Sequence, residues 1–121
     1  KLRLSEKVRE LKSKGDYRQA LDIHYEDLIR RKTGGQSQIL QGREFDVVTD
    51  TKLIQAKRSN AAINNPNNFL KGSTRKQIKE TVRVANELGL QPEYWFKYGV
   101  HPRVREYIES KGIKVVIGFG E

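Results

Sequence analysis

The 121-residue sequence contains no cysteine, no methionine and only two histidines. Without cysteine the protein has no disulfide framework, zinc–thiolate site or cysteine nucleophile, and two histidines cannot form a histidine-rich metal site. Any bound metal must therefore be held mainly by carboxylate and carbonyl oxygens, which are the ligands that Mg²⁺ and Mn²⁺ prefer. Since methionine is missing even from position 1, we expect the chain to be a segment of a longer polypeptide.

Long hydrophobic runs are missing too. No apolar stretch approaches the roughly 20 residues of a transmembrane helix, and the N-terminus lacks the pattern of a signal peptide. Charge of one sign is plentiful, because 24 lysines and arginines against 15 acidic residues give a formal net charge of +9. Such a surface attracts polyanions, and nucleic acid is the first candidate. From the length we expect one soluble domain over residues 1–121 rather than two.

Apolar periodicity and turn residues predict a mixed α/β fold. Helices are expected over residues 5–14, 16–32, 73–88 and 102–111, and strands over residues 37–40, 42–48, 53–58, 93–98 and 113–117. Residues 59–72 contain five asparagines and one proline and are expected to form an irregular loop. The order helix, three strands, helix, strand, helix, strand calls for a mixed sheet flanked by helices. Residues 1–15 are expected to be a linker helix from the longer chain.

Two of the predicted helices carry finer signals. In the helix over residues 16–32, apolar spacing predicts an inward face made of Tyr17, Ala20, Leu21, His24, Tyr25 and Leu28. The helix over residues 73–88 starts with Thr74-x-x-Gln77, which is the pattern of a capping box.

The most informative stretch runs from Gly42 to Arg58 and is predicted to form a β-hairpin with its turn at Thr49 to Lys52. Symmetric pairing across this turn sets Asp46 opposite Gln55 and Glu44 opposite Lys57, and opposed residues share a face. The polar face then gathers Glu44, Asp46, Gln55 and Lys57. The apolar face consists of Phe45, Val47, Ile54 and Ala56.

Two interpretations of the polar face are open from the residues alone. It is either a solvated surface with a cross-strand Glu44–Lys57 ion pair, or a site in which a metal-binding acid lies beside a lysine. Nucleases hold a scissile phosphate with the second arrangement, because a metal and a cation stabilise the charge that develops on the phosphate oxygens.

The hairpin and the order of elements together resemble the PD-(D/E)xK nuclease superfamily, whose core runs helix, three strands, helix, strand. Asp46 and the run Gln55-Ala56-Lys57 fill the positions of its motif. More narrowly, residues 42–50, 55–57 and 75–79 resemble the restriction-endonuclease-fold toxin domains at the C-termini of bacterial polymorphic toxins, which include contact-dependent growth inhibition effectors. The resemblance covers residues 16–118 and implies a restriction-endonuclease-like core.

The resemblance also implies roles for individual residues. Asp46 and Gln55 would bind a divalent metal, and Lys57 would position or activate the attacking water. Mg²⁺ is implied first, with Mn²⁺ or Zn²⁺ as alternatives. Gln55 stands where a carboxylate is commoner, which removes one negative charge and favours one metal ion over two.

Superfamily members often add a glutamate from the first core helix, and the matching residue here is Glu26. Helical geometry places Glu26 almost opposite the face centred on Leu21 and Leu28, whereas Asp27 lies nearer the edge of that face. The resemblance nevertheless favours Glu26 as a further catalytic residue and as the third metal ligand, and because of the helical geometry we keep Asp27 as the alternative.

Four further residues are candidates for substrate binding. Arg58 follows the motif lysine and is a possible phosphate contact. Thr74, Arg75 and Gln77 begin a helix whose free amides and positive dipole end suit a phosphate. The alternative is a capping box with solvated basic residues.

The resemblance implies a metal-dependent nuclease toxin module of a secreted or cell-surface-delivered effector, acting in the cytoplasm of a target bacterium. We favour tRNA as the substrate, because a small basic domain must find it by shape and charge, which a compact folded RNA offers. The expected partners are an acidic immunity protein, whose charge complements the basic toxin, and a host translation elongation factor. The alternatives are a DNase with the same residues and a noncatalytic nucleic-acid-binding module.

Overall fold

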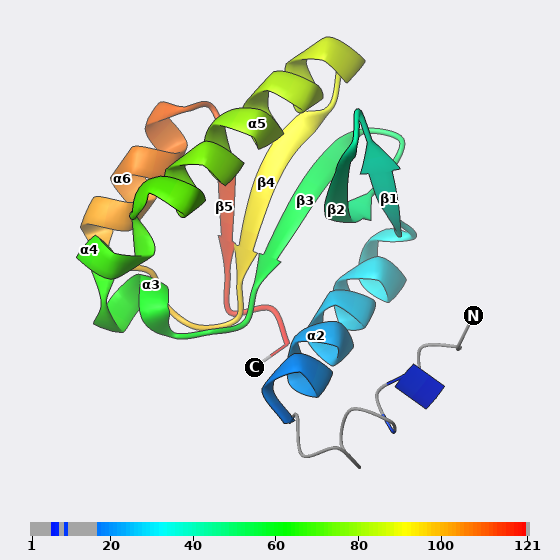
Figure 1. The fold of residues 1–121 in the computed structure, drawn as a ribbon, viewed down its shortest axis with the longest axis horizontal. Helices are drawn as coiled ribbons and strands as arrows, with labels where there is room; N and C mark the ends of the chain where they lie inside the picture. The colour runs from blue at the N-terminus through cyan, green and yellow to red at the C-terminus, as the bar shows by residue number, and fades with distance from the viewer. Residues whose placement is uncertain (1–5, 8, 10–16, 121) are drawn as a thin grey trace.

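The computed structural model describes residues 6, 7, 9 and 17–120, and Figure 1 shows their arrangement. The elements are α2 (Tyr17–Thr33), β1 (Gln36–Leu40), β2 (Arg43–Val48), β3 (Lys52–Lys57), α3 (Ala61–Asn64), α4 (Pro66–Phe69), α5 (Gly72–Leu88), β4 (Gln91–Phe96), α6 (Pro102–Ser110) and β5 (Lys114–Ile117). The predicted order of long helices and strands is confirmed. The helix predicted over residues 5–14 lies, apart from residues 6, 7 and 9, outside the described residues. No described helix is long and apolar enough to cross a membrane.

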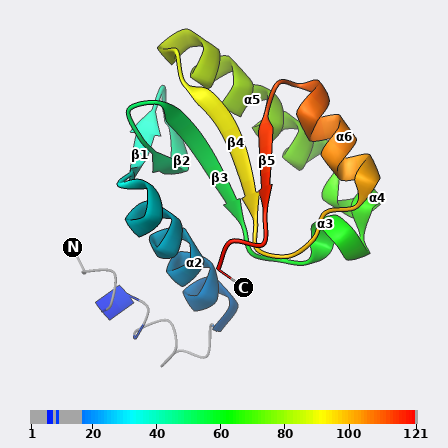
Figure 2. The ribbon, with the colours of Figure 1, turned by 180° about the vertical axis from the view of Figure 1, so that it is seen from behind.

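The five strands form one mixed sheet in the order β1-β2-β3-β4-β5. The first three strands are antiparallel neighbours, whereas β3, β4 and β5 run parallel to one another. Parallel neighbours need crossover connections, which α5 and α6 supply. The carboxyl ends of the three parallel strands therefore meet at one edge of the sheet, the lower edge in Figure 1 and in the reverse view of Figure 2. Open α/β sheets bind their ligands at this edge.

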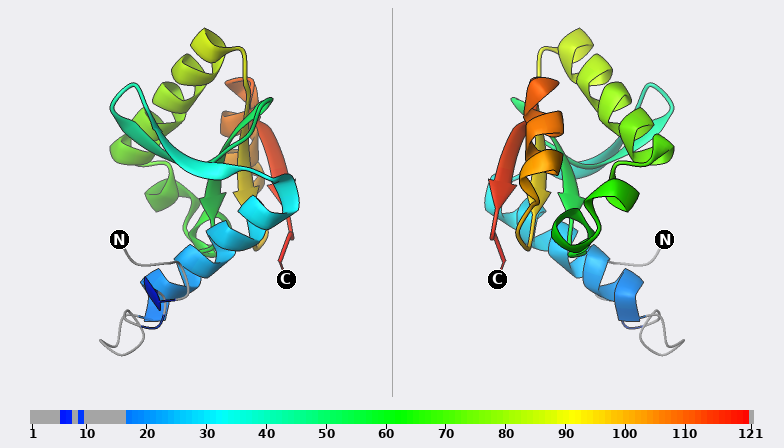
Figure 3. Two further views of the ribbon diagram at one scale, coloured as in Figure 1. Left: turned by 90° about the vertical axis from the view of Figure 1, so that its right-hand side faces the viewer. Right: turned by 90° about the vertical axis from the view of Figure 1, so that its left-hand side faces the viewer.

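Helices cover both faces of the sheet. Tyr25 and Ile29 of α2 pack on one face in an apolar cluster with Val47, Ile54 and Trp95. The other face carries two clusters, in which α5 and α6 cover β2, β3 and β4. The side views of Figure 3 show α5 and α6 on the same side of β5. Residues adjacent along a strand thus enter different clusters, as the alternation of a strand requires.

The predicted hairpin register is confirmed where β2 and β3 pair. Val48 pairs with Leu53 and Val47 with Ile54, and the Thr49 N–H donates to the Lys52 carbonyl at 3.0 Å. Within the described part of the chain the pairing ends there, so the predicted opposition of Asp46 to Gln55 and of Glu44 to Lys57 is wrong. The two strands separate at the residues that carry charge.

The predicted faces of the hairpin are wrong in two places. Phe45 packs with Leu53 and Val84 under α5, not with Val47 under α2. Gln55 is only 2% exposed. The interpretation as a solvated face assumed that one side of the hairpin meets water, but a helix covers each side.

The inward face of α2 also differs from the prediction. Tyr17 and Leu21 are 62% and 44% exposed, and His24 is exposed, whereas Tyr25 and Ile29 are buried. Apolar residues occur on several sides of this helix, so its periodicity does not single out one face. Ala20 and Tyr25 are buried as predicted, and the apolar patch of the sheet adds Ile29 to the stripe of Tyr25.

Residues 59–72, predicted as an irregular loop, contain α3 and α4. Each is a single turn closed by backbone bonds, from the Asn65 N–H to the Ala61 carbonyl at 2.8 Å and from the Leu70 N–H to the Pro66 carbonyl at 3.0 Å. Pro66 begins α4 at a position where its missing N–H costs nothing. Asparagine disfavours long helices but tolerates a single turn, which is why its abundance misled the prediction.

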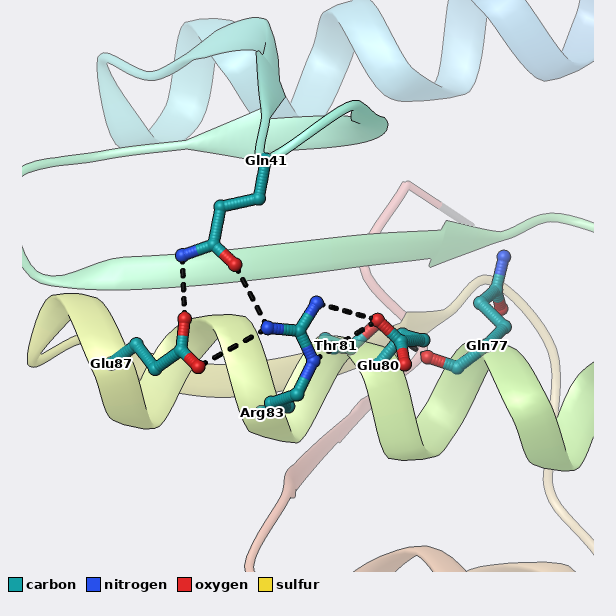
Figure 4. A network of polar contacts seen from close by, with 6 residues as sticks. All are labelled: Gln41, Gln77, Glu80, Thr81, Arg83 and Glu87. Atoms are coloured by element: carbon teal, nitrogen blue, oxygen red, sulfur yellow. Dashed lines mark hydrogen bonds and ion pairs between the residues drawn. The ribbon is translucent and has the colours of Figure 1, made fainter.

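The β1–β2 turn is attached to α5 by a set of exposed polar contacts (Figure 4). Gln41 and the next residue, Gly42, both have positive φ, 52° and 79°, as a two-residue hairpin turn requires. The Gln41 amide donates to Glu87 at 2.6 Å and accepts from Arg83 at 2.8 Å, and Arg83 also pairs with Glu80 at 2.7 Å. These contacts fix the antiparallel end of the sheet over α5.

The predicted capping box at the start of α5 does not form. The N-cap is Lys71, at which the described residues show no side-chain capping bond. Gln77 instead accepts a hydrogen bond from the Tyr94 hydroxyl at 2.9 Å. The first turn of α5 therefore leaves its amides free of side-chain caps.

Candidate active site

Asp46 lies where β2 and β3 separate, and its backbone and side chain are both held. The Asp46 carboxylate accepts a hydrogen bond from the Ala56 N–H at 2.9 Å. Its carbonyl accepts from the Arg30 guanidinium at 3.2 Å. The Asp46 carboxylate thus accepts the backbone hydrogen bond of Ala56, the residue of β3 between Gln55 and Lys57, in place of a backbone carbonyl of a neighbouring strand. Burial raises its pKa, although the bond from Ala56 and the charge of Lys57 oppose this.

Glu26 of α2 lies within electrostatic range of Asp46. It follows the buried Tyr25 and precedes Ile29 by one helical turn, so it lies on the side of α2 that meets the sheet. Burial, together with the negative charge of Asp46, raises the pKa of Glu26 to about 7. Arg30, 3.7 Å away, offsets only part of this.

Asp27, the alternative to Glu26, is engaged elsewhere. Its carboxylate forms an ion pair with Arg31 at 2.8 Å, and the Arg31 side chain is 78% exposed. The structure therefore brings Glu26, not Asp27, into the electrostatic neighbourhood of Asp46 and Glu44.

Lys57 ends β3 on the same edge of the sheet. Its ammonium lies 5.7 Å from the centre of the Tyr94 ring. Burial lowers the pKa of Lys57, while the carboxylates of Asp46, Glu26 and Asp22 raise it in opposition. A half-buried cation is thus held close to two half-buried acids, an arrangement that suits phosphate chemistry.

A cavity of about 200 Å³ opens between α2, the end of β3 and α4. Its lining residues are Asp22, Tyr25, Glu26, Ala56, Lys57, Arg58, Ser59 and Phe69. Arg58 donates to Asp22 at 2.7 Å, which places a second cation at the wall of this cavity. We call this space the catalytic cavity below.

Gln55 lies behind the cavity in a polar contact with α5. Its Nε2 donates to the Thr81 hydroxyl at 3.3 Å, an orientation that leaves the amide oxygen as the possible metal ligand. Gln77, which is also on α5, accepts a hydrogen bond from the hydroxyl of Tyr94 on β4. The structure thus gathers Glu26, Asp46, Gln55, Lys57 and Arg58 at one edge of the sheet.

Two other predicted substrate contacts, Thr74 and Arg75, are not among the residues that line the catalytic cavity. Thr74 is half-buried in the first turn of α5. Arg75 turns toward α6, where its guanidinium lies 4.6 Å from the centre of the Tyr107 ring. It therefore does not line the catalytic cavity.

Sequence reasoning missed two residues of the cavity wall. Asp22 binds Arg58, and Tyr25 has the one buried side-chain hydroxyl that lacks a hydrogen-bond partner among the described residues. Asp22, Tyr25, Glu26 and Ile29 are spaced as one stripe of a helix, and that spacing was the available signal.

The donor atoms fit a hard divalent cation, although the cluster is small. No group of three or more histidine, cysteine or acidic side chains close enough to hold a metal occurs in residues 6, 7, 9 and 17–120. The available donors are the carboxylates of Glu26 and Asp46 and the amide oxygen of Gln55. Burial raises the pKa of both carboxyl groups, and their mutual repulsion adds to the pKa of Glu26. A cation with oxygen ligands would offset the negative charge of the two carboxylates.

Comparison with known proteins gives one match. Residues 13–118 match the model of the family Tox-REase-3, described as restriction endonuclease fold toxin 3. Neither a search of curated proteins nor a search of solved structures returned a match.

Proposed function

The chain belongs to the restriction endonuclease fold toxin 3 family, and from this premise we propose that it is a metal-dependent phosphodiesterase that hydrolyses nucleic acid. The observation that supports this most is the convergence of Glu26, Asp46 and Lys57, from α2, β2 and β3, at the carboxyl edge of the parallel strands. Two acids and a cation at one place are the minimal set for phosphodiester hydrolysis.

The roles of the residues follow from their charge and position. Restriction-endonuclease-fold nucleases generally use divalent metals, and Glu26, Asp46 and Gln55 would hold the ion here. When bound, the ion would stabilise negative charge on the phosphate oxygens. Lys57 donates N–H bonds to the phosphate and orients the attacking water. Because burial lowers its pKa, a larger fraction of Lys57 than of an ordinary lysine is neutral at a given pH and able to accept a proton.

The substrate and partners are proposed from charge. A net charge of +9 on 121 residues favours a polyanion, and we favour tRNA over DNA because a compact folded RNA presents shape as well as charge. As a module of a secreted or contact-dependent effector, the toxin would act in the cytoplasm of the target bacterium. An acidic immunity protein would neutralise it in the producing cell, and a host elongation factor would assist tRNA cleavage.

Parallel incubations test the proposal. With Mg²⁺, the purified protein is expected to cleave total RNA, and excess EDTA is expected to stop the reaction. Gel analysis of total RNA and of a plasmid, incubated side by side with the protein, distinguishes an RNase from a DNase. Cleavage of the plasmid alone would make the protein a DNase. Binding of both nucleic acids without cleavage by Mg²⁺, Mn²⁺ or Zn²⁺ would make it a noncatalytic module.

The raised pKa of Glu26 predicts an inverted dependence of stability on pH. Between about pH 4.5 and pH 7 the folded protein binds more protons than the unfolded chain, so the free energy of unfolding of the metal-free protein should fall as pH rises. A shift from 4.5 to about 7 corresponds to a loss on the order of 3 kcal/mol. Urea unfolding at pH 5 and pH 7.5 in EDTA measures it, and Mg²⁺ should restore stability at pH 7.5 only.

Glu26→Gln should flatten this pH dependence, because the amide has no proton to exchange. Asp27→Asn, one residue away on the same helix, is the matched control and should keep the slope of the parent. Equal slopes in the two variants would show that Glu26 is not the titrating carboxyl.

A further inference from the structure

A second concave surface lies where α6 meets the start of α5. It has a volume of about 300 Å³ and is lined by Leu70, Arg75, Arg103, Glu106, Tyr107 and Ser110. The first two come from the start of the α5 region, and the others come from α6. We call this surface the α5–α6 groove.

The α5–α6 groove carries positive charge that the protein does not neutralise. Arg75 and Arg103 line it, and the ammonium of Lys111 lies 5.2 Å from the centre of the Tyr107 ring. In the described ranges, no carboxylate forms an ion pair with any of these three cations. Other arginines do have such partners, as Arg105 pairs with Glu109 on the same helix. Glu106 at the wall balances one of the three charges at most.

Arg75 is held in place before any ligand arrives. Its Nε donates to the Leu70 carbonyl at 2.7 Å, and its guanidinium lies over Tyr107. A guanidinium has five N–H donors, so four remain for a ligand. Because little side-chain freedom is left to lose, a bound phosphate would cost less entropy here than at a free surface arginine.

Neighbouring residues of the chain line the groove and the catalytic cavity. Phe69 lines the catalytic cavity and the next residue, Leu70, lines the groove. Because consecutive Cα atoms are about 3.8 Å apart, the two surfaces have adjoining edges. A strand bound beside Lys57 would therefore extend toward the cations of the groove.

We propose that the α5–α6 groove binds the sugar–phosphate backbone of the substrate strand next to the cleaved bond. This inference rests on the proposed function and extends it to a second contact region. An acidic protein could meet the same charges, but the adjoining edges of the groove and the catalytic cavity, at Phe69 and Leu70, favour the strand that occupies that cavity. The contact is with phosphate, so it strengthens binding without selecting bases.

Arg103→Gln tests the groove, and Arg105→Gln is the matched control. Both arginines are exposed on α6, but Arg103 lines the groove and its guanidinium donates to the side chain of Asn67, whereas Arg105 pairs with Glu109. Arg75 is unsuitable for the test because its removal would also loosen the packing of α5 on α6. Neither exposed substitution should alter the fold.

Binding of a labelled RNA of about 20 nucleotides is measured by fluorescence anisotropy in EDTA, so that no cleavage occurs, at several salt concentrations. Arg103→Gln is expected to raise Kd by about tenfold and to lower the slope of log Kd against log salt by about 0.7, the loss of one phosphate contact. With Mg²⁺, KM should rise similarly while kcat stays within about twofold. Arg105→Gln should match the parent.

Equal Kd and equal salt slopes in the parent and in Arg103→Gln would overturn the groove and leave the proposed nuclease intact. A fall in kcat with KM unchanged would also overturn it, because a backbone contact acts through binding. A parent protein that neither binds nor cleaves the RNA or a plasmid would instead remove the proposed function itself.

Discussion

Replacing Lys57 with methionine is expected to lower the rate of nucleic-acid cleavage by about 10³-fold while leaving the protein folded. The loss corresponds to about 4 kcal/mol of transition-state stabilisation, as expected when the cation facing the phosphate is removed. Methionine keeps the length of the aliphatic stem against Tyr94. Since burial already disfavours the charge of Lys57, the free energy of unfolding should be unchanged or slightly higher.

Single-turnover cleavage rates and urea unfolding, measured on the same preparation, check both halves of this expectation. Lys114→Met, an exposed lysine of β5, is the control and should keep the parental rate. If Lys57→Met retained a tenth or more of the parental rate, Lys57 would not be the catalytic cation. If it unfolded, the lysine would be structural.

Asp46→Asn is expected to lower cleavage by a similar factor of about 10³ and to weaken binding of the divalent ion. The amide oxygen can still accept the bond from the Ala56 N–H, so the separation of β2 and β3 should persist. Removing the half-buried Asp46 carboxylate also removes its repulsion of Glu26, and the pKa of Glu26 should move down toward its ordinary value. Stability at pH 7.5 in EDTA should therefore not fall.

Glu44→Gln is the matched control for Asp46→Asn. Glu44 belongs to the same strand but is exposed, and its charge only modestly affects the two buried acids. Cleavage rates and Mg²⁺ titrations should leave Glu44→Gln within about threefold of the parent, a change below 1 kcal/mol. Equal losses in the two variants would favour a surface ion-pair network over a metal-binding acid at Asp46.

The elements of the fold followed from local patterns in the sequence. Pro102 at the start of α6 and Gly89 in the left-handed conformation at the end of α5 are signals that act within one turn of chain. Local signals of this kind are strong, because one residue type fits the required backbone better than the others. The single turns of α3 and α4 were missed because so short a helix leaves no periodic pattern.

The sequence predicted a set of residues for the candidate site but not their arrangement. The hairpin motif named Asp46, Gln55 and Lys57, and resemblance added Glu26, although the helical wheel argued against it. The wheel failed because α2 has apolar residues on several sides, and only the sheet decides which of them it buries. The sheet buries Tyr25 and Ile29, and this orientation of α2 brings Glu26 into the electrostatic range of Asp46.

The β2–β3 hairpin shows the same division between sequence and structure. By itself the sequence determined the register, the acid–lysine motif, the net charge and the absence of sulfur ligands, because these depend on residue types and on neighbours along the chain. Only the tertiary structure decided that β2 and β3 separate at Asp46, that Gln55 is buried against α5, and that Arg75 faces α6. Those facts depend on contacts between residues far apart in sequence, where helices on both faces of the sheet set burial, and burial sets the charge state of the acids and the lysine.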